Sequence, residues 1–106
     1  MKFSVFERIT LLNILPQEGD FLTIKIIRKL REELSFSEQE HKALEIKIED
    51  GRVYWKPEAA TEKDIKIKDK ATEIIVNALK DLDAKKKITD GCLSLYEKFI
   101  KETGDD

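Results

Sequence analysis

GDFLTIKIIRKLREEL, residues 19–34, is the stretch around which we expect the rest of the chain to pack. Apolar side chains recur along it at three- and four-residue steps, which is the spacing of an amphipathic helix. Asp20 can accept hydrogen bonds from the first backbone N–H groups of this helix, and Gly19 lets the chain turn before it. The apolar stripe comprises Phe21, Ile24, Ile27, Leu30 and Leu34, and Leu22 and Ile26 widen it. The pattern therefore predicts a central helix that needs cover on more than half of its circumference.

Length and charge favour one domain with no strong electrostatic field. The chain has 106 residues, and its 20 Lys and Arg stand against 22 Asp and Glu, for a net charge of −2. A chain of this size supports one modest hydrophobic core. A near-neutral charge does not predict nucleic acid as the default ligand. We expect a single compact domain over residues 1–103 and a frayed tail at residues 104–106.

Capping motifs place two further helices around the central one. Ser4 and Glu7 have the spacing of a capping box, which predicts a first helix that Pro16 ends. Its expected apolar face is Val5, Phe6, Ile9 and Leu12, with Leu11 beside it. Ser37 and Glu40 repeat the capping box and predict a short acidic helical turn as far as residue 42.

The pattern then changes to the alternation of β-strands. Residues 44–49 and 52–56 flank Asp50-Gly51, a dipeptide that favours a two-residue type I′ turn. This hairpin would pair Glu49 with Arg52, Ile48 with Val53, Lys47 with Tyr54 and Ile46 with Trp55. Its apolar face, Ile46, Ile48, Val53 and Trp55, is expected to cover the central helix. Residues 64–68 alternate again and predict a third strand of the same sheet.

Two helices complete the expected fold. Asp69 is the predicted cap of a long helix with a regular apolar stripe, and Thr89 or Asp90 that of a last helix containing Cys92. The fold class is therefore α+β, with two N-terminal helices, a short acidic helical turn, a mainly antiparallel three-stranded sheet including the hairpin, and two C-terminal helices.

No constellation of residues indicates a reaction. His41 is the one histidine, in an acidic turn expected at the surface, and a metal site or a general base needs partners that the sequence does not supply there. Cys92 lies on an apolar helix stripe, where a buried thiol behaves as a small hydrophobe. There is no Gly-rich phosphate loop among the four glycines. We therefore expect a chain that is not an enzyme and has no cofactor and no metal.

One alternative function is nucleic-acid binding. Three helical segments followed by a hairpin have the element order of a winged-helix DNA reader, and Lys25, Arg28, Lys29 and Arg31 form a basic edge on the central helix. The third segment, however, carries carboxylates that would repel phosphates. Arg28 and Lys29 also precede Glu32 and Glu33 by four residues, the spacing of surface ion pairs. A solvated face is therefore favoured over a ligand site.

Protein binding is the leading functional hypothesis. Tyr54 is expected on the outer face of the hairpin, where an exposed ring suits a protein contact. The acidic turn adds Glu38, Glu40 and Glu45 as candidate contact residues. The C-terminal helix stripes could pack inward or form a dimer seam, and the sequence leaves both open. No export signal or membrane span is visible, so we expect a cytoplasmic protein.

Four runs of the sequence carry a resemblance to known proteins. Residues 7–21, 27–34, 69–82 and 93–99 resemble a group of small proteins encoded by bacteriophages and prophages. The resemblance extends along nearly the whole chain and is one of overall pattern, without a catalytic motif. It implies a phage or prophage accessory protein, and by analogy a host or phage protein as its partner.

Overall fold

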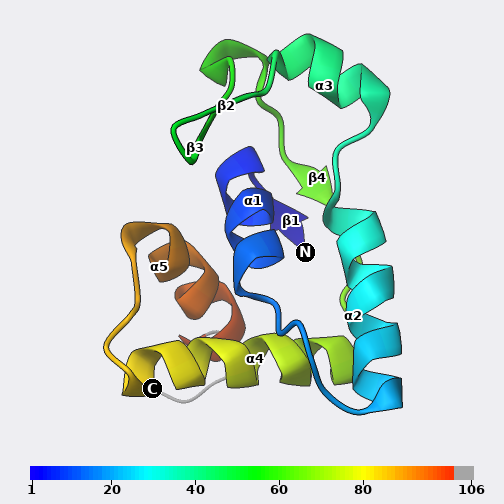
Figure 1. Ribbon diagram of the computed structural model, residues 1–106, viewed down its shortest axis with the longest axis vertical. Coiled ribbons are helices and arrows are strands. Elements are labelled where there is room, and N and C mark those ends of the chain that lie inside the picture. Colours follow the sequence, from blue (N-terminus) through cyan, green and yellow to red (C-terminus); the bar gives the residue numbers. More distant parts are fainter. Residues whose placement is uncertain (102–106) are drawn as a thin grey trace.

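The computed structural model describes residues 1–101 and has the α+β architecture expected from the sequence. Within those residues the chain forms five α-helices and two small antiparallel sheets (Figure 1). The elements are β1 (Lys2–Phe3), α1 (Val5–Ile14), α2 (Phe21–Leu34), α3 (Glu38–Leu44), β2 (Lys47–Glu49), β3 (Arg52–Tyr54), a 3-10 turn (Pro57–Ala59), β4 (Lys63–Asp64), α4 (Asp69–Ala84), α5 (Asp90–Tyr96) and a π-helical turn (Glu97–Lys101). The predicted tail at residues 104–106 lies outside the described residues.

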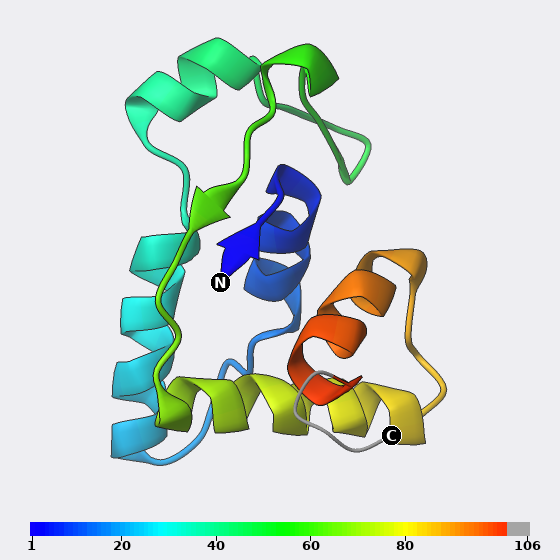
Figure 2. The ribbon, with the colours of Figure 1, turned by 180° about the vertical axis from the view of Figure 1, so that it is seen from behind.

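The helix α2 is central, but its apolar stripe is fully buried only from Ile27 to Leu34. Ile27, Leu30 and Leu34 lie in the core with α1, α4 and α5. The prediction that the stripe starts at Phe21 is wrong, since Phe21 is 83% exposed and Leu22 is 58% exposed. The first turn of α2 reaches past α4, so the helices that cover the rest of α2 do not cover this end (Figures 1 and 2).

Local hydrogen bonds fix the helix starts where the capping patterns predict. Ser4 and Ser37 each form a complete capping box, and the side chain of Asp20 accepts from the backbone N–H of Thr23 at 2.8 Å. The prediction that Asp69 caps α4 is wrong. Lys68 occupies the N-cap and provides no side-chain hydrogen bond, and Asp69 is instead the first helical residue. There its carboxylate lies beside the positive end of the helix dipole.

The sheets differ from the predicted three-stranded sheet. The hairpin has the expected register, with Lys47 opposite Tyr54, Ile48 opposite Val53 and Glu49 opposite Arg52. The third strand does not join it. The β4 strand pairs with β1 instead, and the backbone N–H of Ile65 donates to the carbonyl of Met1 at 2.9 Å. The N-terminal segment thus supplies the partner strand, which gives two separate two-stranded sheets.

The hairpin does not cover α2 as predicted. After α3 the chain has moved away from α2, and the hairpin lies on the opposite side of α1 (Figures 1 and 2). Trp55 packs against Phe6 of α1, with ring centroids 6.2 Å apart. Ile48 remains 74% exposed. The expected cover of α2 by the apolar hairpin face is therefore wrong, and α1 and α4 provide that cover instead.

The buried face of α1 contains charged residues that its apolar pattern does not predict. Phe6 is half exposed, whereas Arg8 is 1% exposed. The Arg8 guanidinium donates to the carbonyls of Leu34 and Ser35, at 3.1 and 2.7 Å, and to Glu40 at 2.6 Å. The ring of Phe36 covers it at 3.9 Å. Arg8 thereby joins the end of α2 to the start of α3, and its charge is neutralised by Glu40.

Candidate binding groove between α2 and α4

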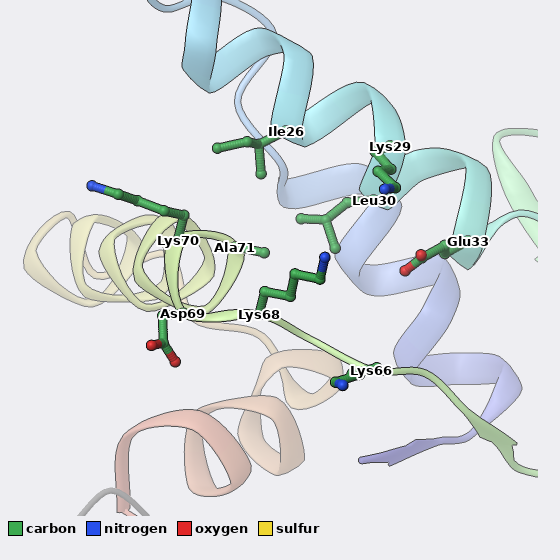
Figure 3. Close-up of a pocket in the computed structure, with 9 residues that line it drawn as sticks. All are labelled: Ile26, Lys29, Leu30, Glu33, Lys66, Lys68, Asp69, Lys70 and Ala71. Atoms are coloured by element: carbon green, nitrogen blue, oxygen red, sulfur yellow. The ribbon is translucent and has the colours of Figure 1, made fainter.

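A groove with a cavity volume of about 640 Å³ lies between α2 and the segment that leads into α4 (Figure 3). Its lining residues are Ile26, Lys29, Leu30 and Glu33 on α2, and Lys66, Lys68, Asp69, Lys70 and Ala71 on the other wall. Ile26, Leu30 and Ala71 project into the space between the two walls (Figure 3). The groove therefore combines an apolar floor with a mostly basic rim.

The α2 wall follows from helical spacing. Residues separated by three, four, seven or eight positions lie on one side of a helix. Ile26, Lys29, Leu30 and Glu33 have these separations, and Leu22 lies four residues before Ile26 on the same side. Leu22 is thus aligned with the groove floor, beyond the lining residues. Its exposure extends the apolar strip of α2 toward the open end of the helix.

The opposite wall follows from the alternation of residues 65–68. Ile65 is buried and Ile67 packs against the core, so the extended backbone directs Lys66 and Lys68 to the other side. Figure 3 shows the Lys68 side chain reaching across the groove toward α2. Lys70 follows in the first turn of α4. The segment predicted as a third strand thus supplies two of the four lysines that line the groove.

The lysines of the groove are not neutralised by the chain itself. In the described part of the chain, Lys29, Lys66, Lys68 and Lys70 form no ion pair or hydrogen bond through their ammonium groups. The predicted ion pairs of Arg28 with Glu32 and of Lys29 with Glu33 are likewise not formed. Exposed pairs of this kind gain little free energy from one fixed geometry. The four ammonium groups outnumber the two carboxylates of the groove, Glu33 and Asp69.

The predicted basic edge of α2 is divided between different environments. Lys25 and Arg28 are exposed, and Lys29 lines the groove. The Arg31 guanidinium donates to the carbonyl of Leu15 at 3.4 Å and is half-buried. The β2–β3 hairpin, which would be the wing of a winged-helix protein, forms a sheet of two strands, and β1 pairs with β4 instead. Of the four predicted nucleic-acid contacts, the structure places one, Lys29, in the groove.

The predicted protein-contact residues do not form one open surface either. Tyr54 and Glu38 are exposed. Glu45 is ion-paired with Lys56, and the hydrogen bond from that ammonium lowers the pKa of Glu45. Glu40 faces Arg8, whose hydrogen bonds lower the pKa of the Glu40 carboxyl to about 2. Two of the three carboxylates therefore already have partners within the chain.

Two residues considered for chemistry lie where their patterns predict. His41 is exposed, with its ring edge against Phe36 at a centroid distance of 6.2 Å. Cys92 is buried, and its sulfur lies 3.5 Å from the hydroxyl of Thr89. Within residues 1–101, no three His, Cys, Asp or Glu side chains are grouped to hold a metal ion.

Sequence reasoning missed the groove because its two walls lie more than 30 residues apart. The sequence contains the pattern of each wall separately. The isoleucines and lysines of residues 65–68 alternate, and Leu22, Ile26 and Lys29 have one-face spacing on α2. Nothing local indicates that these two segments meet.

None of the helices in residues 1–101 combines the length and apolar composition needed to cross a bilayer. Comparisons with protein-family models, curated proteins and solved structures found no match for this chain.

Proposed function

We propose that this chain is a non-catalytic protein-binding module and that the groove between α2 and α4 is its binding surface. The observation that carries the proposal is an apolar floor, formed by Ile26, Leu30 and Ala71, flanked by four lysines without partners in the described chain. Protein-binding surfaces commonly combine an apolar centre with a polar rim. A concave surface also lets a partner bury more of its area per residue than a flat one.

The setting of this function is part of the proposal. The resemblance to phage and prophage proteins favours an accessory protein that acts in the cytoplasm of a host cell on a host or phage protein. Self-association through the same groove is a further form of protein binding, and it would make the partner a second copy of the chain.

Nucleic-acid binding is the second candidate, and the presence of Lys29, Lys66, Lys68 and Lys70 along one groove favours it. The apolar floor of Ile26, Leu30 and Ala71 opposes it, because phosphates and sugars would leave that surface without an apolar contact. Filter binding at low salt separates the two functions. Retention of single- or double-stranded DNA or RNA that falls steeply as salt is raised would support nucleic-acid binding.

Site-specific photo-crosslinking tests the proposed function. A photoreactive amino acid is placed at Leu22, beside the groove, and in a second protein at Leu93, which is 54% exposed on α5 and does not line the groove. The two proteins are expressed in bacterial cells, irradiated and purified, and the covalent adducts are identified by mass spectrometry. We expect one recurrent protein adduct at position 22 that is missing at position 93.

A second variant shows whether such an adduct depends on the groove. Lys66→Glu with Lys68→Glu reverses two rim charges at exposed positions and should leave the fold intact. The adduct at position 22 should then fall at least about fivefold, because the reversal changes the charge of the rim that the partner would contact. Adducts that are equal at both positions, or unchanged in the double variant, would contradict the proposal. Nucleic-acid adducts at position 22 would favour the second candidate.

A further inference from the structure

We infer that the occupant of the groove is an acidic amphipathic helix of a partner protein. This inference rests on the proposed function and adds the chemistry of the partner to it. Two features of the groove lead to it: an apolar strip that runs along α2, and an unneutralised basic rim on the wall facing that strip.

The strip has the dimensions of a helix-binding surface. Leu22, Ile26 and Leu30 follow one another at four-residue steps on one side of α2. At 1.5 Å per residue these positions span about 12 Å, or about two helical turns, and because Leu30 is 4% exposed the accessible apolar surface comes from Leu22 and Ile26. A partner helix laid against it would present apolar side chains at three- and four-residue steps, which is how amphipathic helices bind grooves. Leu22 and Ile26 are exposed or half-buried in the free chain, so such a partner would remove apolar surface from water.

The rim determines the charge of that partner. Lys66, Lys68 and Lys70 follow one another along the wall opposite α2, and Lys29 lies on the α2 side. Asp69 in the first turn of α4 compensates the positive end of that helix, so the lysines themselves carry the positive charge of the rim. The local charge is therefore opposite in sign to the net charge of −2 of the whole chain. Carboxylates on both sides of an apolar stripe would satisfy these ammonium groups while the stripe contacts the floor.

A nucleic acid matches one of these two features. Phosphates would pair with the lysines, but they would leave the apolar strip of Leu22, Ile26 and Leu30 without a complementary surface. A basic amphipathic helix matches the other feature and would meet repulsion from four ammonium groups. The acidic amphipathic helix satisfies both, which is why we commit to it.

Synthetic peptides of about 14 residues, or four helical turns, test the inference. The first has leucines at three- and four-residue steps and glutamates on either side. The second keeps the leucines and replaces the glutamates with lysines. The third has the composition of the first, with the leucines shuffled so that they form no stripe. Each carries a fluorescent label, and binding to the full chain is measured by fluorescence anisotropy, with a labelled DNA oligonucleotide as a fourth probe.

We expect the first peptide to bind at least about tenfold more tightly than the other two peptides and the oligonucleotide. Lys66→Glu with Lys68→Glu should weaken that binding by about tenfold or more, and less at high salt. The matched control, Lys80→Glu with Lys87→Glu, makes the same charge change at exposed positions that do not line the groove and should stay within about twofold. Leu22→Gln should weaken binding about fivefold, whereas Leu93→Gln should not. Circular dichroism checks that each variant is folded.

Equal binding of the first and third peptides would overturn the inference, since the charge of the peptides alone would then explain their binding. Tighter binding of the basic peptide or of the oligonucleotide, or equal loss in the Lys80 and Lys87 control, would overturn it as well. Failure of the inference remains distinguishable from failure of the proposed function. If no peptide binds but position 22 still gives a groove-dependent protein adduct, the groove binds a protein of different chemistry, or a second copy, which sedimentation identifies. If no peptide binds and position 22 gives no groove-dependent protein adduct, both the inference and the proposed function are wrong.

Discussion

Replacing Glu40 by glutamine tests how much the ion pair between the buried Arg8 and Glu40 contributes to the stability of the fold. Glutamine at this position retains an acceptor for Arg8 and preserves the third position of the capping box opened by Ser37. The substitution therefore removes the negative charge and one of the two oxygens that accept hydrogen bonds from Arg8. We expect lower stability at neutral pH, because a buried guanidinium loses the carboxylate that compensates it.

The magnitude follows from the pKa of Glu40. Hydrogen bonds from Arg8 lower this pKa from its ordinary value of 4.5 to about 2. That difference corresponds to about 3 kcal/mol, at 1.36 kcal/mol per pH unit. The Glu40 side chain is 31% exposed, and solvent screening reduces the contribution. We therefore expect Glu40→Gln to reduce the free energy of unfolding by about 2 kcal/mol at pH 7.

The pH dependence provides a second readout with a definite sign. Because the folded-state pKa is depressed, the Glu40 contribution is fully present above pH 4.5 and is lost as the pH falls toward 2. Urea unfolding of the wild type and of Glu40→Gln should give a stability difference that shrinks over this range. Glu38→Gln is the matched control, since Glu38 is an exposed carboxylate of the same helix, and it should change stability by less than about 0.5 kcal/mol. A Glu40→Gln effect as small as the control, or one independent of pH, would refute the reasoning.

Three other substitutions test the close contact at Gly91, the effect of Lys98 on the pKa of Glu7, and the exposure of Phe21. Gly91→Ala should destabilise the fold by about 1–3 kcal/mol in thermal unfolding, because the added Cβ would lie 2.8 Å from Thr10 Oγ1, and Thr10→Ala should recover part of that loss. Lys98→Met should raise the pKa of Glu7 in an NMR titration: burial raises this pKa, and the hydrogen bond from Lys98 is the first of the contacts that lower it. An unchanged pKa would contradict that role. Phe21→Ala should alter stability by less than about 0.5 kcal/mol in urea unfolding, and a larger loss would mean that this ring is covered in solution.

The candidate residues were predictable where one short segment defines them. His41 was expected at the surface and Cys92 in the core, and both predictions are confirmed. The basic edge of α2 was identified as Lys25, Arg28, Lys29 and Arg31, but its residues separate in the structure because Arg31 turns toward Leu15. The sequence pattern does not show which of these basic side chains will be half-buried, because the group that binds Arg31 lies 16 residues away along the chain.

The sequence by itself determined the helix starts at Val5, Phe21 and Glu38 and the register of the hairpin. Each depends on hydrogen bonds between residues a few positions apart, as in Ser4 with Glu7, Ser37 with Glu40 and the Asp50-Gly51 turn. These interactions form from local backbone geometry and side-chain chemistry, so a short window of sequence contains all of their partners.

Tertiary structure alone decided the burial of Arg8, the partner of the strand at Lys63–Asp64 and the groove between α2 and α4. Arg8 bonds residues 26 to 32 positions away, and the ammonium group of Met1 bonds Asp64. Whether such distant groups meet depends on how the helices pack together, because the entropy cost of closing long loops is repaid by the whole core rather than by one contact. The proposed binding surface belongs to this second class, since α2 and the segment before α4 acquire a shared groove only when the core brings them together.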